Sequence, residues 1–349
     1  MKEYSEVILQ EATALFKEHG SARAASAASG IAYSTMKSRV RAAKSRGIFT
    51  KDDAPTADIV APDLPEVYDE IEDVVMHMKK QFEKRFKREK AKKWMPFKVN
   101  MKGPIGVAWF GDPHVDDNGC NWPLLDSHLG QLEETEGLFR ANIGDSTNNW
   151  GSRLMHLWAN QDTSQETARE LVRYLLTRGD WLIWLMGNHD LWNDGNALLK
   201  EMGAHVVPMF DWQAQFKLVF PNKREARIWA AHQFPGHSMW NTLHGPVKAA
   251  HMKDWAHLYV CGHTHNWALH KEESASREFV YWIARTRGYK FIDDHSDKLG
   301  HQSQESGASV ISIFEPDAPN ETRFLHCYDD FEEGVDVLNW KRAKWKETW

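Results

Sequence analysis

Seven side chains that can donate an electron pair to a metal ion follow short apolar runs in this sequence. They are two carboxylates, one amide and four imidazoles: Asp112, His114, Asp145, Asn188, His232, His263 and His265. A mixed nitrogen and oxygen set of this size suits two divalent transition metals better than one tetrahedral zinc. In such sites a carboxylate commonly bridges the ions, which together generate a hydroxide and clamp a phosphoryl oxygen. The residue types therefore indicate hydrolysis of a phosphate ester.

The apolar runs before these donors are rich in β-branched and aromatic residues and predict strands. They span residues 105–110, 138–143, 181–186, 226–231 and 258–261. The carboxyl ends of strands in an α/β sheet form its ligand-binding edge, so donors that follow different strands meet there. An amphipathic run over 153–176 is long enough for a crossover helix.

The region after the last donor predicts further elements. Runs over 308–314 and 322–327 predict strands that complete a sheet or sandwich, and the basic tail over 341–349 predicts a solvated terminal helix.

The order of the polar clusters resembles that of the calcineurin-like metallophosphoesterase superfamily. The pattern of that superfamily is D-x-H, G-D-x-x-D/N, G-N-H-D/E, H and G-H-x-H, and all five blocks occur here in that order over roughly residues 103–330. The resemblance implies an α/β fold, an α+β sandwich of four layers, in which two central β-sheets are flanked by helices. It also implies a metal-dependent phosphoesterase.

The same resemblance implies a role for each residue of the blocks. The first ion would be held by Asp112, His114 and His265, and the second by Asn188, His232 and His263. Asp145 would bridge the two ions. His189 would act as general acid on the leaving oxygen or stabilise the phosphoryl charge, and Asp190 would orient it. Mn²⁺ is the expected metal, and Fe or Zn could occupy the same ligands.

Residues beside the blocks favour a phosphodiester. Protein Ser/Thr phosphatases of this superfamily carry an arginine just before G-N-H-E and another after the G-D block, but neither place holds arginine here. A dianionic monoester would need such bidentate clamps. Candidate substrate contacts are Asn148, Trp150, His237 and Trp267. The two tryptophans could stack bases, or instead fill the core or the pocket wall.

The first fifty residues resemble a helix-turn-helix unit. Apolar residues recur at helical spacing up to His19-Gly20, Ser21 can cap a short Ala-rich helix, and Gly30 supplies a sharp turn. Ser34 or Thr35 would cap a third helix that runs to about Arg46, with Met36 and Val40 facing inward. The candidate DNA contacts on that helix are Thr35, Lys37, Ser38, Arg39 and Arg41. The alternative is a small three-helix module with a solvated basic face.

Charge is segregated along the chain and predicts its organisation. Residues 1–50 carry eight basic and four acidic residues, 52–73 carry nine acidic and no basic ones, and 77–102 carry eleven basic and two acidic ones. We expect a helix-turn-helix domain over 1–50, an acidic, proline-containing linker over 51–73, a basic helix or linker over 74–102 and a catalytic domain over 103–349. The basic segment could track phosphates or pack on the catalytic domain.

Composition excludes several classes of protein. The 349 residues contain no apolar run long enough for a transmembrane helix, so no membrane partner is expected. The first residues lack the apolar core of a secretory signal. Three scattered cysteines argue for a reducing cytoplasm, and for a chain encoded by a phage this would be the cytoplasm of the host cell. There is no Walker A sequence, so an ATPase partner would be a separate chain; a homo-oligomer is compatible with the sequence.

These observations together predict a dimetal-dependent phosphodiesterase, most simply a DNA nuclease that uses a metal-bridging hydroxide. The pattern is similar to SbcD-type DNA-repair nucleases and to phage or prophage metallophosphoesterases with an N-terminal helix-turn-helix. Two alternatives stay open: a phosphodiesterase or phosphatase for a small or cyclic nucleotide, and a non-catalytic DNA-binding or assembly protein.

Overall fold

The structure of the chain is a computed structural model, which describes residues 4–49, 71–203, 207–238, 240–274, 279–293 and 306–348. Contacts divide the chain into two compact units, Met1–Met78 and Lys79–Trp349. Most of the predicted linker over 51–73 lies outside the described residues. No described helix is both long enough and apolar enough to cross a membrane.

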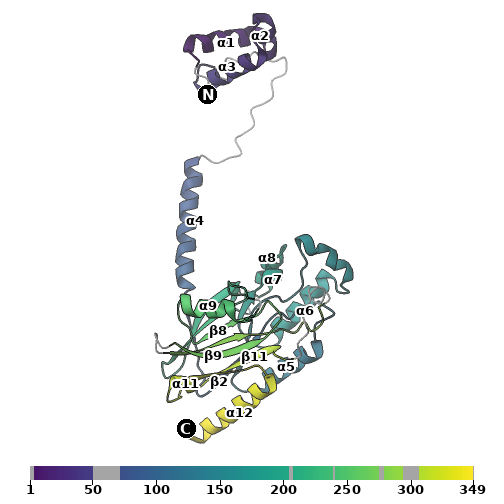
Figure 1. Cartoon of the computed structure of the whole chain (residues 1–349), viewed down its shortest axis with the longest axis vertical. Helices are drawn as coiled ribbons and strands as arrows, with labels where there is room; N and C mark the ends of the chain where they lie inside the picture. The colour runs from purple at the N-terminus through teal and green to yellow at the C-terminus, as the bar shows by residue number, and fades with distance from the viewer. Residues whose placement is uncertain are drawn as a thin grey trace. The chain divides into compact units, whose positions relative to one another are not determined.

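Residues 4–49 of the first unit contain three helices (Figure 1): α1 (Glu6–His19), α2 (Ala22–Ser29) and α3 (Tyr33–Ser45). The Ser21 hydroxyl accepts a hydrogen bond from the Ala24 amide at 3.1 Å, so the predicted cap of α2 is confirmed. Met36 and Val40 are buried as predicted. The predicted cap of α3 by Ser34 or Thr35 is wrong, because Gly30 turns the chain early enough for the helix to begin at Tyr33.

The basic segment forms one helix, α4 (Ile71–Ala91), and the boundary between the two units falls within it. None of its residues is buried. Its apolar residues recur at helical spacing, and the rings of Phe82 and Phe86 stack with centroids 5.7 Å apart. The helix predicted for this segment is confirmed up to Ala91, but residues 95–98 of the same segment form a strand of the second unit, which therefore begins before the expected residue 103.

The described part of the second unit contains two mixed six-stranded sheets. The first has the order β12-β11-β2-β3-β4-β5, from Leu325–Tyr328, Ser309–Phe314, Ile105–Phe110, Leu138–Asn142, Trp181–Met186 and Met209–Asp211. The second has the order β1-β6-β7-β8-β10-β9, from Met95–Lys98, Gln213–Val219, Glu225–Ala231, Leu258–Cys261, Phe279–Arg285 and Ala268–Ser274.

The sheets pack face to face because their strands alternate apolar residues between two buried sides. In β2, Val107 and Trp109 face the core between the sheets, whereas Ala108 and Phe110 face helices. The helices on that outer side are α5 (Trp122–Glu134), α6 (Gln165–Thr177) and α12 (Phe331–Thr348). The other sheet is covered by α9 (His244–Met252), on the opposite side of the strands from α12 (Figure 1). The predicted α/β architecture of two central sheets with flanking helices is confirmed.

The sheet order brings the predicted donors to one edge. Strands β2, β3 and β4 are parallel neighbours in one sheet, and β7, β8 and β10 are parallel neighbours in the other. The carboxyl ends of parallel neighbours lie at the same edge. Strand β10 ends at the same edge, although the polar residues after it were not among the predicted donor clusters.

Two helical predictions need correction. The crossover helix expected over 153–176 is divided into a 3₁₀ segment, η2 (Ser152–Asn160), and α6, because Ser164 caps a new helix by accepting a hydrogen bond from the Thr167 amide at 3.1 Å. The terminal helix is longer than expected and is not merely solvated. It starts at Phe331 and buries that ring together with Leu338 and Arg342.

Candidate metal centre

The seven predicted donors gather where β2, β3, β4, β7 and β8 end. Three groups of side chains place their ligand atoms within 4.8 Å of one another: Asp112, His114 and His265; His114, Asp145 and His189; and Asp145, His232 and His263. Asn188 joins the third group, since its Oδ1 atom lies 3.0 Å from His232 Nε2. The first and third groups contain the residues predicted for two separate ions. Asp145 belongs to the second and third groups but not to the first, which shares only His114 with the second, so its bridging role and the other ligand roles stay predictions.

The backbone at these donors is unusual. Five of the seven have positive φ values between 41° and 74°: Asp112, His114, Asp145, His263 and His265. Residues other than glycine rarely adopt this left-handed region, and each such residue costs on the order of 1–3 kcal/mol. The fold retains this strain where it turns five side chains toward a common point, which is typical of functional sites.

Glycines beside the donors allow the loops to approach each other closely. A Cβ atom on Gly187 would lie 2.1 Å from Asp145 Oδ1, and one on Gly262 would lie 2.3 Å from Asp112 Oδ2. A Cβ on Gly144 would lie 2.5 Å from His232 Nδ1. The glycine of each of these three blocks therefore leaves room for a donor that another block supplies.

Backbone groups hold one side of each buried carboxylate. The His263 amide donates to Asp112 Oδ2 at 2.8 Å, and the His189 amide donates to Asp145 Oδ1 at 2.9 Å. The Ile143 carbonyl lies 3.0 Å from His232 Nδ1, and a hydrogen bond there places the proton on Nδ1 and leaves the Nε2 lone pair for a ligand role.

The remaining donor atoms fit a bound cation. Asp112 Oδ1 and both ring nitrogens of His114 are buried without a hydrogen-bond partner among the described residues. His232 Nε2 faces Asn188 Oδ1 and His263 Nδ1 at 3.0 Å and Asp145 Oδ2 at 3.3 Å. Donor atoms about 2.1 Å from one ion lie roughly 3.0–3.4 Å from each other. The chemistry and the spacing of the donors therefore suit divalent ions.

Burial dominates the electrostatics of the centre. It lowers the pKa values of His263 and His265 to about 4, so both imidazoles are neutral and able to coordinate. Burial also raises the pKa of Asp112 to about 8. Burial alone would lower the pKa of His232, but the nearby Asp145 carboxylate raises it to about 9 and is itself held well below its usual pKa.

His189 lies beside the donors in an aromatic surround. Its Nδ1 atom is hydrogen-bonded to the Asn148 carbonyl oxygen, and its ring centroid lies 4.2 Å from that of Trp192 and 5.3 Å from that of Trp150. Burial lowers the pKa of His189. The Asp190 carboxylate accepts instead from the Ser146 and Gly187 amides at 2.9 and 3.0 Å. The Asn148 carbonyl thus fixes the orientation of the His189 ring, which is the role that was expected of Asp190. Asp190 instead ties the loop after β3 to the loop after β4.

The other predicted substrate contacts are dispersed. Trp150 is only 7% exposed and forms part of the wall beside His189. Trp267 is half-buried against Gly307, and His237 is exposed on the loop after β7.

The predicted DNA contacts share one helix, α3. Lys37, Ser38 and Arg41 are exposed, whereas Thr35 and Arg39 are half-buried. The Tyr4 hydroxyl donates to Ser38 Oγ at 3.2 Å, and the Arg39 guanidinium lies 5.8 Å from the centroid of the same tyrosine ring.

Sequence reasoning missed two cations at the end of β10 and in the loop after it. Arg285 donates to Thr264 Oγ1 of the G-H-T-H block, and Lys290 lies 3.0 Å from Asp117 Oδ2 and 3.5 Å from Asp293 Oδ2. Both cationic side chains are buried. An apolar run over 279–284 followed by polar residues was the signal that could have revealed them.

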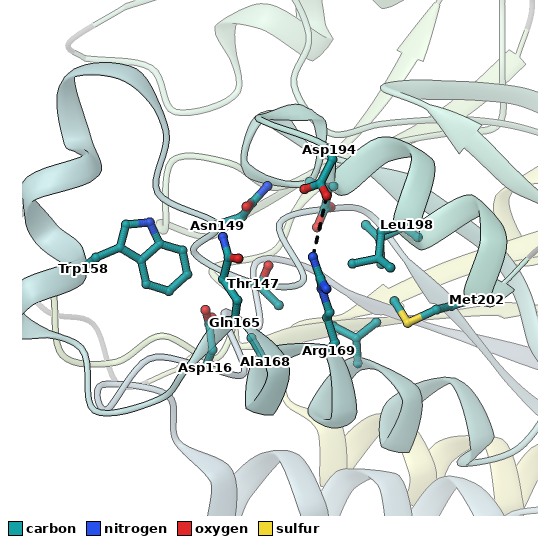
Figure 2. A pocket seen from close by; sticks show the side chains of 14 residues that line it. Asp116, Thr147, Asn149, Trp158, Gln165, Ala168, Arg169, Asp194, Leu198 and Met202 are labelled. Atoms are coloured by element: carbon teal, nitrogen blue, oxygen red, sulfur yellow. Dashed lines mark ion pairs between the residues drawn. The ribbon is translucent and has the colours of Figure 1, made fainter.

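Figure 2 shows a pocket between α6, α8 (Gly195–Gly203) and the loop after β3, in which Arg169 points toward Asp194 at 3.6 Å. Its volume is about 40 Å³, so it can hold water but not a nucleotide. Asp116 and Asp190 also line it. We therefore regard this pocket as part of the structure around the metal centre and not as a substrate-binding site.

No protein-family model matches the chain, and no curated protein is similar to it in sequence. Among solved structures it is similar to the NAD nucleotidase NadN of Haemophilus influenzae, with 9% identity and a TM-score of 0.36 over 64% of this chain and 49% of that chain. The chain thus spans about half the length of NadN.

Two shorter structures are also similar. The calcineurin-like phosphoesterase YfkN of Bacillus subtilis has 8% identity and a TM-score of 0.37, over 70% of this chain and 98% of that one. A metallophosphoesterase of Sphaerobacter thermophilus has 16% identity and a TM-score of 0.33, over 68% of this chain and 95% of that one. TM-scores this low carry no argument, so assignment of a family stays a proposal.

Replacing Gly187 by alanine tests the close approach of the loops. The added Cβ would displace Asp145, so we expect Gly187→Ala to lower the affinity for Mn²⁺ at least about tenfold. Gly130→Ala is the matched control, because nothing lies within 4 Å of its new Cβ and helix α5 gains a better helix former. Isothermal titration calorimetry measures both affinities. Unchanged binding in Gly187→Ala would contradict this account of the centre.

Metal binding should also depend on pH. The raised pKa values of Asp112 and His232, about 8 and about 9, mean that protons occupy the metal-free centre at pH 7 and must leave when an ion binds. Affinity should therefore rise from pH 6 to 9, with release of at least one proton per chain. Calorimetry in buffers of different ionisation enthalpy counts these protons. An affinity that does not change over this range would show that the donors are not protonated.

Proposed function

We propose that this chain is a metal-dependent phosphodiesterase of the calcineurin-like metallophosphoesterase superfamily that cleaves DNA. The observation that carries the proposal is the convergence of seven donors that follow five strands, with Asp145 close both to His114 and to His232 and His263. Asp112, His114 and His265 would hold one divalent ion, and Asn188, His232 and His263 the other. Mn²⁺ is the ion we expect, and Fe or Zn would also suit these ligands.

When bound, the two ions would activate water and neutralise charge on the phosphoryl oxygens. The chain's own residues would do the rest. Hydrolysis forms one P–O bond to water and breaks the P–O bond to the leaving group, whose oxygen then takes a proton. His189 is the proposed donor of that proton: its Nδ1–H donates to the Asn148 carbonyl, and the proton to be transferred would be on Nε2 of the imidazolium form, which the neighbouring Asp145 carboxylate favours although burial lowers the pKa. Burial of the centre strengthens each of these electrostatic interactions.

The preference for a diester cannot rest on missing arginines alone. No arginine stands beside the G-D and G-N-H blocks in the sequence, but Arg285 and Lys290 come near the centre from the end of β10. Lys290 is paired with two carboxylates and Arg285 with Thr264, so neither presents the exposed fork that a dianionic monoester would require. This pairing supports the diester.

The N-terminal unit supports DNA as the substrate. Helix α3 exposes Lys37 and Arg41 on the side away from Met36 and Val40, which are buried against α1 and α2. A short basic helix held by two others can enter a groove and neutralise phosphates. A small-nucleotide phosphodiesterase is the alternative for the same centre, and a non-catalytic DNA-binding protein is the alternative for the same N-terminal unit.

The first test replaces the proposed acid. With Mn²⁺, His189→Ala should reduce the cleavage of linear duplex and single-stranded DNA by roughly 10²–10⁴-fold, while the metal content stays unchanged. His251→Ala, an exposed histidine of α9, is the control and should keep full activity. RNA and cyclic nucleotides are assayed beside DNA. Turnover of cyclic nucleotides without DNA cleavage would favour the alternative enzyme, and cleavage after complete metal removal would exclude the proposed chemistry.

The second test concerns α3. Replacing Lys37 and Arg41 together by alanine should weaken DNA binding and reduce the slope of log affinity against log salt by about two. Hydrolysis of bis(p-nitrophenyl) phosphate should not change. Arg23→Ala, an exposed cation on α2, is the matched control. If the wild-type protein, the double variant and Arg23→Ala have equal DNA affinity and salt slope, α3 does not bind the DNA phosphates.

A further inference from the structure

A second cavity, hereafter the side cavity, adjoins the metal centre. Its volume is about 300 Å³, and it lies between the loops that follow β2, β3 and β10 and the segment η2. Asn148 and Trp150 line it and also contact His189, and Asp293 lines it with an Oδ2 atom 3.9 Å from His265 Nδ1. The side cavity is therefore lined by two residues in direct contact with His189, the residue proposed to protonate the leaving oxygen.

The size of the side cavity limits its occupant. Ligand sites usually measure about 300–1,000 Å³, so this one is at the lower limit and has room for one small organic group. A stretch of polynucleotide would not fit. A single nucleoside, a base with its sugar, is of suitable size.

The lining is rich in amides. Asn118, Asn148, Asn160 and Gln161 line the side cavity, together with the apolar side chain of Leu157 and the ring of Trp150. Asn148 is only 1% exposed, and its Oδ1 atom has no hydrogen-bond partner among the described residues. Its Nδ2 group is already engaged by Asp117 at 2.6 Å and Gln161 at 3.2 Å. Asn148 Oδ1 is enclosed by protein, so the lining amides that can exchange hydrogen bonds with an occupant are the exposed ones of Asn118 and Asn160.

The charges on the lining argue against an anionic occupant. Lys290 brings one positive charge, but Asp117 and Asp293 lie 3.0 and 3.5 Å from its Nζ atom and bring two negative charges. The Lys290 Nζ atom also lies 5.3 Å from the centroid of the Trp150 ring, so the ammonium group covers part of the ring face. A second phosphate would meet a wall of net charge −1, whereas a neutral group with both donors and acceptors would find partners for each.

We propose that the side cavity binds the nucleoside of the leaving group when a phosphodiester is cleaved at the metal centre. This inference rests on the proposed function and narrows it. The nucleotide next to the scissile bond must leave its neighbours and place its base and sugar among the amides. The substrate is therefore a strand whose nucleotide can be splayed out, such as a single strand or a chain end, rather than a continuous duplex.

A substitution in η2 tests the inference. Leu157→Trp would fill the side cavity from a residue outside the metal centre. The matched control is Met155→Trp on the same segment, whose side chain is 59% exposed and does not line the cavity. The probes are thymidine and adenosine, measured with the full-length protein in two ways: by direct binding in isothermal titration calorimetry, and by competition with bis(p-nitrophenyl) phosphate hydrolysis in Mn²⁺.

We expect both nucleosides to bind to the wild-type protein and to Met155→Trp, and to bind at least about tenfold more weakly to Leu157→Trp. Asn160→Ala is a milder second variant in case Leu157→Trp folds poorly, and it should weaken binding about fivefold, as the loss of one hydrogen bond does. Circular dichroism melting identifies a misfolded variant.

The outcomes separate this inference from the proposed function. If the diester is hydrolysed but neither nucleoside binds, or if Leu157→Trp and Asn160→Ala bind them as well as the control does, the inference is wrong and the proposed function stands. If no metal supports hydrolysis while nucleosides still bind in the cavity, the proposed function fails, and the leaving-group role fails with it.

Discussion

The arrangement of the second unit depends on the burial of a crowded group of electron-pair donors away from water. Asp112, Asp145 and His232 are at most 2% exposed, so charge on any of them must be balanced inside the protein. Backbone amides balance one oxygen of each carboxylate, and the other oxygens and the ring nitrogens of His114 face inward. This arrangement is costly for a chain without cations and favourable for one that binds them.

The sandwich makes such crowding feasible because it supplies donors from two sheets to one edge. Each sheet alone has three parallel strands ending there, β2-β3-β4 and β7-β8-β10, which would provide about half of the donors. The apolar core between the sheets fixes their separation, so the donors of the two sheets meet in one defined arrangement. The glycines and left-handed donors complete this fit, since a Cβ at Gly187 or Gly262 would occupy the place of a carboxylate oxygen.

Much of this arrangement could be predicted from the sequence. Strands β2, β4 and β8 have the predicted bounds, because a buried strand is a short apolar run and the polar residues after it mark its end. Strand β10 was missed as a contributor because arginine and lysine are not ligands, and their approach to Thr264 and Asp117 depends on the packing of distant loops. The expectation that Asp190 orients His189 differed from the structure for a related reason: sequence patterns show side chains, whereas the group that fixes His189 is a backbone carbonyl. The break between η2 and α6 and the side cavity that η2 encloses also depend on tertiary contacts, such as that of Gln161 with Asp116 at 2.8 Å.

The distribution of charge along the chain bears on how its segments would share the binding of DNA. The overall charge of −6 divides into −4 for Met1–Met78 and −2 for Lys79–Trp349, but the basic residues lie in 1–50, with a net +4, and in 77–102, so residues 103–349 carry a net −11 and repel a polyanion. Bound divalent ions would reverse that repulsion only at the centre itself, within about a Debye length of 8–10 Å. Phosphate contacts on α3 would supply the missing attraction at a distance, because joining a weak DNA-binding module to the centre through one chain raises the local concentration of substrate. In the proposed function, affinity for long DNA would come largely from α3, whereas the side cavity would select the nucleotide to be cleaved.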